Sequence, residues 1–211
     1  SLYLLDVNTL KAETLVAEDG FLGGASFSPD GTQILLTGSP ETLGGIGLNL
    51  PEGLIPNQYD YQMYLMNLAD KKITPVTKDF NPSVQQTVWN KVDGQIYFTA
   101  ENRDYISLYR MNPKDGKIQE LEAKEDLVKS ISLADGVPVL AYYGQGAMNS
   151  DRLYTMDIKK GKTTLVEDLS KDILKDVQLG ECHAWNFVSS RGDTIYGRYY
   201  LPPHFDASKK Y

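Results

Sequence analysis

Hydrophobic residues along this chain fall into short runs separated by polar turns that contain glycine, the pattern of an all-β protein. One run occurs four times: a Leu or Met, a Tyr, two further residues, and then an Asn or Asp. Its tyrosines stand 61, 45 and 45 residues apart, at Tyr3, Tyr64, Tyr109 and Tyr154. A period near 45 residues is typical of stacked supersecondary units and lies in the range of propeller blades.

Each period contains the signals for further strands. An apolar run, an Asp-Gly pair and a second apolar run precede the last three tyrosines, with the pairs at 30–31, 93–94 and 135–136. In Ser28-Pro29-Asp30-Gly31 the proline sets φ for a turn and the glycine accepts a positive φ, which predicts a hairpin. Another short strand follows each tyrosine strand, at 72–77, 117–121 and 162–166. We therefore expect four antiparallel strands per period, which make one blade.

Several of these strands, such as 63–66 and 95–100, are apolar on both faces. A blade is covered on each side by its neighbours, whereas a plain antiparallel sandwich, the alternative fold, exposes one face of each sheet. The 45-residue period favours the propeller. We predict an all-β fold, a partial β-propeller with two strands at 1–17 and about three four-stranded blades at 24–78, 83–122 and 127–167. Propellers close with four to eight blades, so we expect this chain to be a piece of a larger protein that supplies the missing ones.

The first period is longer than the others because of a Gly- and Pro-rich stretch at 38–53, which predicts an inserted loop. Its Gly44-Gly45-Ile46-Gly47 run lacks the Lys-Ser/Thr ending and the spacing of a phosphate loop, so no nucleotide site is predicted. A loop that reaches toward a substrate or partner and a merely decorative insertion both fit this stretch. Glu41 and Glu52 are its carboxylates.

The blade pattern breaks after Val166. Leu165, Leu169, Ile173, Leu174 and Val177 are spaced as one helix face that Ser170 could cap, so we expect a short helix. A hairpin over 184–201 and a polar segment at 202–211 follow, and a second domain is predicted to begin near 181.

Composition narrows the function classes. The 211 residues are 41% hydrophobic and 23% charged, a globular balance, and the net charge of −7 opposes binding to nucleic acid. No apolar run is long enough for a membrane helix. The single cysteine, Cys182, fits a small buried hydrophobe better than a nucleophile, and His183 and His204 lack the spacing of a catalytic or metal site. No cofactor is expected. A carbohydrate-active propeller would need clustered carboxylates and exposed tryptophans, whereas Trp89 and Trp185 stand in strand-like runs.

The junction residues carry a resemblance to a known family. Glu167-Asp168, the Leu-Ser-Lys-Asp-Ile-Leu stretch after it, and the segment from Tyr200 through Leu-Pro-Pro-His-Phe-Asp to Lys-Lys-Tyr211 resemble the junction of dipeptidyl peptidase IV-like members of the prolyl oligopeptidase family. The Ser-Pro-Asp-Gly turn is common both in that family and in TolB-type propellers. The resemblance implies a propeller at 1–180 and, at 181–211, the opening hairpin of an α/β-hydrolase domain.

The resemblance also implies a function. Such peptidases use a Ser-Asp-His triad whose serine stands on a Gly-x-Ser-x-Gly elbow. This chain has no such elbow, so we expect no catalytic residue and no hydrolysis by the chain alone. Its role would be to gate the access of short peptides to the catalytic domain. Carboxylates from a propeller insertion anchor the substrate amine in that family, which makes Glu41 and Glu52 the candidate substrate-binding residues; two solvated loop carboxylates are the alternative. A non-enzymatic TolB-type scaffold is the second hypothesis. By resemblance alone, a periplasmic or secreted location is favoured over a cytoplasmic one, and a homodimer is possible.

Overall fold

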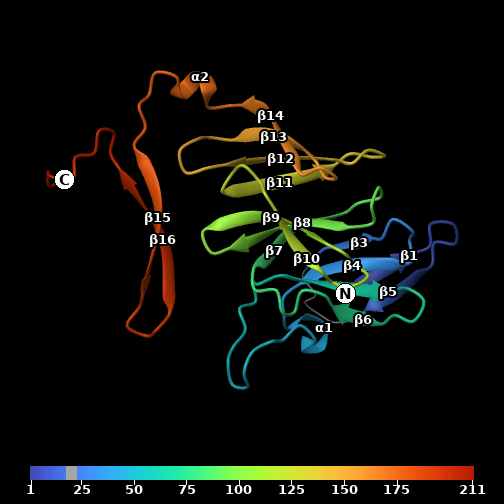
Figure 1. Ribbon diagram of the computed structural model, residues 1–211. Helices are drawn as coiled ribbons and strands as arrows, with labels where there is room; N and C mark the ends of the chain where they lie inside the picture. The colour runs from blue at the N-terminus through green and yellow to red at the C-terminus, as the bar shows by residue number, and fades with distance from the viewer. Residues whose placement is uncertain (18–22) are drawn as a thin grey trace. The chain divides into compact units, whose positions relative to one another are not determined.

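The computed structural model describes residues 1–17 and 23–211, and nearly all of its regular structure is strand (Figure 1). The chain forms two compact units, residues 1–100 with 109–119 and residues 101–108 with 120–211. The predicted boundary between a propeller at 1–180 and a second domain at 181–211 stays a prediction. Within the described residues, no helix is both long and apolar enough to span a bilayer.

The strands occur where the turn signals predicted them. Two strands at the start, β1 (Leu2–Leu5) and β2 (Ala12–Val16), pair with each other. A four-stranded antiparallel sheet follows, with the strands in chain order: β3 (Ala25–Phe27), β4 (Gln33–Gly38), β5 (Gln62–Asn67) and β6 (Ile73–Pro75). The next four are β7 (Ser83–Trp89), β8 (Ile96–Asn102), β9 (Tyr105–Met111) and β10 (Ile118–Leu121), with β10 paired to β9.

A third set of four strands also pairs in chain order: β11 (Leu127–Leu133), β12 (Val139–Gln145), β13 (Arg152–Asp157) and β14 (Lys162–Asp168). A single parallel pair, Leu127 with Ile106, joins β11 to β9. The last two strands, β15 (Glu181–Val188) and β16 (Thr194–Leu201), form a separate hairpin (Figure 1). The prediction of four antiparallel strands per period is therefore confirmed.

Strand β5 is buried on both faces, as its sequence predicted. Met63 and Leu65 belong to one apolar cluster with residues of β7, β8 and β9. Tyr64 and Met66, on the opposite face, belong to a second cluster that includes Val16 of β2. Because successive side chains of a strand point to opposite faces, β5 contributes to two separate cores. Its sheet is covered on both sides, as a blade between neighbouring blades would be.

The repeated tyrosines pack within these cores. Tyr64 is fully buried, and Tyr109 stacks on Phe98 with ring centroids 5.3 Å apart. Tyr154 stacks on Tyr142 at 5.1 Å. The copy at Tyr3 differs, because 61% of its surface is exposed. Three of the four tyrosines are thus packing residues, as the repeat suggested.

The last position of the repeat forms the turn that follows the strand. The side-chain Oδ1 of Asp6 accepts a hydrogen bond from the backbone N–H two residues further on, and Asn67, Asn112 and Asp157 do the same, with distances of 2.8 to 3.0 Å. These are Asx turns, which fix the backbone where the chain reverses. The Asn or Asp of the repeat is therefore explained by local structure.

The helix prediction after the last blade was wrong in extent. Leu165 and Val166 lie in β14, which continues to Asp168, and helix α2 spans only Lys171–Leu174. Ser170 occupies the N-cap position, but its hydroxyl donates to Asp168 and makes no cap hydrogen bond. Leu165, which the helical spacing had included, instead pairs with Tyr154 of β13 as part of β14.

Candidate functional site

The insertion between β4 and β5 forms a compact loop. Helix α1 (Thr42–Gly45) is a single turn in which Leu43 and Gly44 have positive φ. Tyr64 Oη donates to the carbonyl of Ser39 at 2.8 Å, and Gln62 Nε2 donates to the carbonyl of Gly47 at 3.2 Å. Gly47 leaves no room for a side chain, because a Cβ there would lie 2.3 Å from Tyr64 Oη. The β5 side chains therefore hold the loop down.

The predicted substrate-binding carboxylates occupy separate places in this loop. Glu41 accepts a hydrogen bond from Gln58 Nε2 at 2.9 Å, which ties the beginning of the insertion to its end. Glu52 is exposed in a turn that the Leu54 N–H closes on the carbonyl of Pro51. Substrate binding by either residue stays a prediction.

The insertion borders a hollow of about 360 Å³, whose lining residues also come from the start of β5 and the turn before β7. Two carboxylates that the sequence analysis did not single out, Asp60 and Asp79, lie on its wall. Asp60 accepts a local hydrogen bond from Asn57 Nδ2 at 3.1 Å, and Asp79 accepts one from Asn49 Nδ2 at 2.8 Å. The second bond joins the insertion to the turn before β7.

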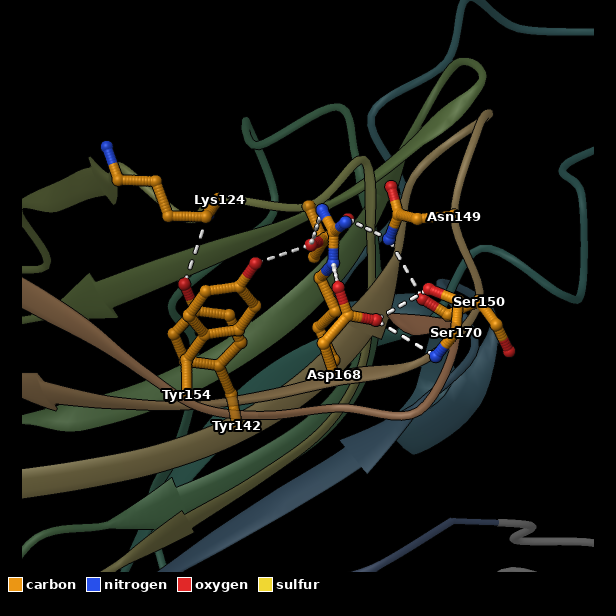
Figure 2. A network of polar contacts seen from close by, with 9 residues as sticks. Lys124, Tyr142, Asn149, Ser150, Tyr154, Asp168 and Ser170 are labelled. Atoms are coloured by element: carbon orange, nitrogen blue, oxygen red, sulfur yellow. Dashed lines mark hydrogen bonds and ion pairs between the residues drawn. The ribbon is translucent and has the colours of Figure 1, made fainter. Parts of the chain in front are cut away.

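A buried carboxylate in the second unit organises a larger polar cluster (Figure 2). The Glu125 side chain is 2% exposed, and Tyr154 Oη donates to its Oε1 at 2.6 Å. Asn149 Nδ2 donates to the other carboxylate oxygen at 2.9 Å, and Arg152 NH1 lies 3.7 Å from Oε1. A buried carboxylate is tolerated only with such partners. Burial, followed by the bond to Glu125, raises the pKa of Tyr154 to about 12.

Arg152 links this carboxylate to a second one on β14. Its Nε donates to Asp168 Oδ2 at 2.8 Å, while Ser170 donates to Asp168 Oδ1 through both its hydroxyl and its backbone N–H (Figure 2). The Ser170 hydroxyl contributes most to a lowered pKa of Asp168, and Arg152 adds to it. Burial lowers the pKa of Arg152, but Asp168 and Glu125 outweigh it and the net shift is upward. The cluster joins charges on β13, on β14 and in the segment before β11. Among the described residues, no group of three or more His, Cys, Asp or Glu could hold a metal ion.

The hairpin β15–β16 contains the cysteine and one histidine of interest. Cys182 lies opposite Tyr200, and a hydrogen bond to Cys182 raises the pKa of that tyrosine. His183 Nε2 lies 2.9 Å from Glu181 Oε2, and its ring stacks on Tyr199. His204 has a positive φ in the turn after β16. Cys182 and His183 thus have neighbours within the same hairpin.

The sequence analysis missed the charged residue that attaches this hairpin to the rest of its unit. Arg198 on β16 makes ion pairs with Asp104 and Asp126, and its guanidinium lies 4.6 Å from the centre of the Tyr105 ring. Arg198 stands 94 and 72 positions from its two partners, so no local pattern connects them. The sequence pattern did not indicate Glu125 either, because it lies in the charged run Lys124-Glu125-Asp126, which resembles a solvated turn.

Comparison with known proteins gives both the fold and a relative, although no family model matches the chain. Dipeptidyl-peptidase 5 of Porphyromonas gingivalis is 27% identical over 150 residues, which are 71% of this chain and 22% of that protein. The acylaminoacyl peptidase of Pyrococcus horikoshii superposes with a TM-score of 0.69 at 22% identity, over 95% of this chain and 28% of that one.

Two further solved structures are a protease propeller and TolB, the latter relevant to the hypothesis of a TolB-type scaffold. The β-propeller domain of the trilobed protease of Pyrococcus furiosus has a TM-score of 0.58 at 19% identity, over 84% of this chain and 45% of that one. TolB of Acinetobacter baumannii has a TM-score of 0.55 at 22% identity, over 79% of this chain and 37% of that one.

The four-strand repeat and these similarities define the chain as a partial β-propeller of the kind found in peptidases. The similarity to dipeptidyl-peptidase 5 and to these peptidase structures supports a propeller region like those of the prolyl oligopeptidase family. The predicted fold class and the family resemblance are confirmed. The chain spans only 22% of the dipeptidyl-peptidase 5 relative and 28% of the acylaminoacyl peptidase.

Proposed function

We propose that this chain is the non-catalytic propeller portion of a serine peptidase that cleaves short peptides, and that it gates their access to a catalytic domain elsewhere in a longer protein. The similarity to dipeptidyl-peptidase 5 over 150 residues carries the proposal. The sequence supports it as well, because it has no Gly-x-Ser-x-Gly elbow on which a nucleophilic serine would stand.

Fluorophosphonate labelling tests the assignment to a serine peptidase. We expect the full-length protein to be labelled at a serine outside residues 1–211 and the 211-residue chain alone to remain unlabelled. Label on the isolated chain would refute the non-catalytic role. An unlabelled full-length protein, shown to be folded, would instead favour the second candidate, a TolB-type scaffold without enzymatic activity, which the superposition on TolB supports.

The gating role has its own test in the full-length protein. The insertion is held to β5 and borders a hollow, so its shortening should widen the route past this blade. Replacing residues 48–57 with a short Gly-Ser turn should raise kcat/KM for long peptides relative to dipeptide substrates. Equal changes for both lengths would count against a gate at this loop.

Glu41 and Glu52 are proposed to anchor the free amine of a peptide substrate, since a carboxylate makes strong charge-assisted hydrogen bonds to an ammonium. Glu41→Gln and Glu52→Gln should each raise KM for peptides with a free amino terminus and leave KM for N-acetylated peptides unchanged. Asp70→Asn, in the β5–β6 turn, is the matched control. An unchanged KM for the free-amino peptides would leave Glu41 and Glu52 as solvated loop carboxylates.

A further inference from the structure

Two residues on one face of β16 contact the charged residues of the β8–β9 turn. Tyr196 and Arg198 are two positions apart, so they share a face of the strand. The guanidinium of Arg103 lies 4.1 Å from the centre of the Tyr196 ring, and Arg198 Nε donates to Asp104 Oδ2 at 2.7 Å. The two turn residues Arg103 and Asp104, with Tyr105 at the start of β9, thus contact two alternate residues of β16.

The backbone of this turn is unusual for its sequence. Arg103 has a φ of 65°, in the left-handed region that long side chains rarely adopt. Glycine or asparagine would fill this position of a two-residue hairpin turn with less strain. An arginine there gives up backbone stability and places its guanidinium over Tyr196.

The second carboxylate that binds Arg198 is presented from a fixed segment. Asp126 follows Glu125, the centre of the buried polar cluster, and its own carbonyl accepts the Ile106 N–H at 2.9 Å. The Lys124 N–H donates to Tyr142 Oη at 3.0 Å (Figure 2). Each residue from Lys124 to Asp126 is therefore anchored, and the Asp126 carboxylate meets Arg198 from a backbone that is already ordered.

The side of the hairpin that faces away from Arg198 is open to solvent. This face, which carries His183, Trp185, Phe187, Ile195 and Tyr199, is largely exposed, with 46% of Trp185 and 45% of Tyr199 accessible. An isolated two-stranded hairpin is marginally stable in water. The Arg198 side chain, by contrast, is only 16% exposed between its two carboxylates.

We propose that Arg198 is a latch: its paired contacts with Asp104 and Asp126 hold the β15–β16 hairpin on the β8–β9 turn and on the 124–126 segment, and the hairpin detaches as a unit when they are broken. Loss of the guanidinium leaves two partly buried carboxylates facing each other, so the closed arrangement then becomes unfavourable. Glu125 acts as a positioning residue, because it orders the segment that presents Asp126. This latch sets where residues 181–211 lie within their unit, and it does not depend on the proposed peptidase function.

Hydrogen–deuterium exchange of the 211-residue chain, followed by peptide, tests the latch. In Arg198→Gln we expect the amides of β15 and β16 to exchange about tenfold faster or more, while those of β11–β14 stay as slow as in the wild type. Arg191→Gln is the matched control, since Arg191 is exposed in the turn of the same hairpin and loses the same charge. Glu125→Gln should increase the amide exchange rates of the hairpin by less than Arg198→Gln does. In the double variant, Arg198→Gln should then raise these rates by a smaller factor than it does in the wild type.

Two further measurements keep the test decisive if Arg198→Gln folds poorly. Arg198→Lys keeps the charge but loses the two-pronged geometry, and should show an intermediate rate. In the wild type, raising the salt from about 0.1 M to about 1 M shortens the screening length from about 10 Å to about 3 Å and should speed hairpin exchange selectively. Wild-type rates in both Arg198 variants, an equal effect of Arg191→Gln, or equal loosening of β11–β14 would overturn the latch.

Discussion

Tyr154 donates a 2.6 Å hydrogen bond to the carboxylate of Glu125, a residue 29 positions earlier in the chain and almost fully buried. Tyr154 is the third internal copy of the repeated tyrosine. Tyr109 stacks on Phe98 at the same position of the repeat, whereas Tyr154 stacks on Tyr142 and also donates to a buried carboxylate. The repeat position has thus been adapted, in this blade, to satisfy a buried carboxylate.

Because Tyr154 donates to the buried Glu125 carboxylate, replacing it with phenylalanine should destabilise the fold. Tyr154→Phe keeps the stacked ring but removes the donor to a buried charged acceptor, a change that costs about 1–3 kcal/mol in the free energy of unfolding. Urea unfolding, followed by circular dichroism, measures it. Tyr143→Phe, at a neighbouring exposed tyrosine, should change the free energy by less than about 0.5 kcal/mol. Equal effects of the two substitutions would show that the hydroxyl of Tyr154 does not stabilise the blade.

Strand β5 should be sensitive on both faces. Leu65→Ala removes a side chain from the cluster shared with β7, β8 and β9, and Met66→Ala removes one from the cluster shared with β2. Each truncation should cost about 2–5 kcal/mol, because each leaves a cavity in a separate core. Val7→Ala, at an exposed position of the same unit, is the control. A sheet with one solvated face would give one large loss and one small loss.

The hydrogen bonds within the Ser28-Pro29-Asp30-Gly31 turn should lower the pKa of the Asp30 carboxyl. The Ser28 hydroxyl contributes most to this shift by donating to Asp30 at 2.6 Å; with the Thr32 N–H and hydroxyl, it lowers the pKa from 3.8 to about 2. A depressed folded-state pKa stabilises the fold above the unfolded value, and this contribution is lost as the pH falls from about 4 toward 2. Carbon-detected NMR of the Asp30 carboxyl should therefore give a low pKa that rises in Ser28→Ala.

Ser26→Ala, on the exposed strand β3 beside this turn, serves as the control and should leave the Asp30 titration unchanged. If Ser28→Ala also left it unchanged, the hydroxyl of Ser28 would not be the main cause of the low pKa.

The strands and their turns could be predicted from the sequence because short stretches of neighbouring residues determine each turn. The Asp-Gly pairs place glycine at a φ of 70° to 79° in Gly31, Gly94 and Gly136, and the Asn or Asp of the repeat closes each following turn. Turn chemistry of this kind depends on two to four neighbouring residues. Strand positions and their chain-order pairing follow from it, whereas the helix expected around Leu165 failed because pairing with β13 decided the conformation.

The candidate sites depend on contacts that no local pattern encodes. Arg198 meets Asp104 across 94 positions, and Glu125 meets Tyr154 across 29. In sequence, these are ordinary charges in turns and on a strand; only the tertiary fold removes them from water and makes partners necessary. Glu41 and Glu52 were chosen because they are the carboxylates of the insertion, yet the hollow beside it is lined by Asp60 and Asp79.

Gly47 provides a test of how the insertion is held to β5. A Cβ at this position would lie 2.3 Å from Tyr64 Oη and 2.5 Å from Gln62 Oε1, closer than real contacts allow. Gly47→Ala should therefore push the loop off the strand, break the bond from Tyr64 to Ser39, and cost about 1–3 kcal/mol in the free energy of unfolding. For a chain of this size, that corresponds to a fall in Tm of about 2–4 °C for each kcal/mol.

The same contact predicts a partial rescue, which separates a local clash from a general loss of stability. Tyr64→Phe removes the nearer of the two oxygens, so Gly47→Ala should cost less in that background than in the wild type. The two substitutions together would then destabilise the chain by less than the sum of their separate effects, by about 0.5 kcal/mol or more in a double-mutant cycle. Strict additivity would mean that Gly47 does not lie against Tyr64 Oη. Calorimetry of the four proteins measures both quantities in one set of experiments.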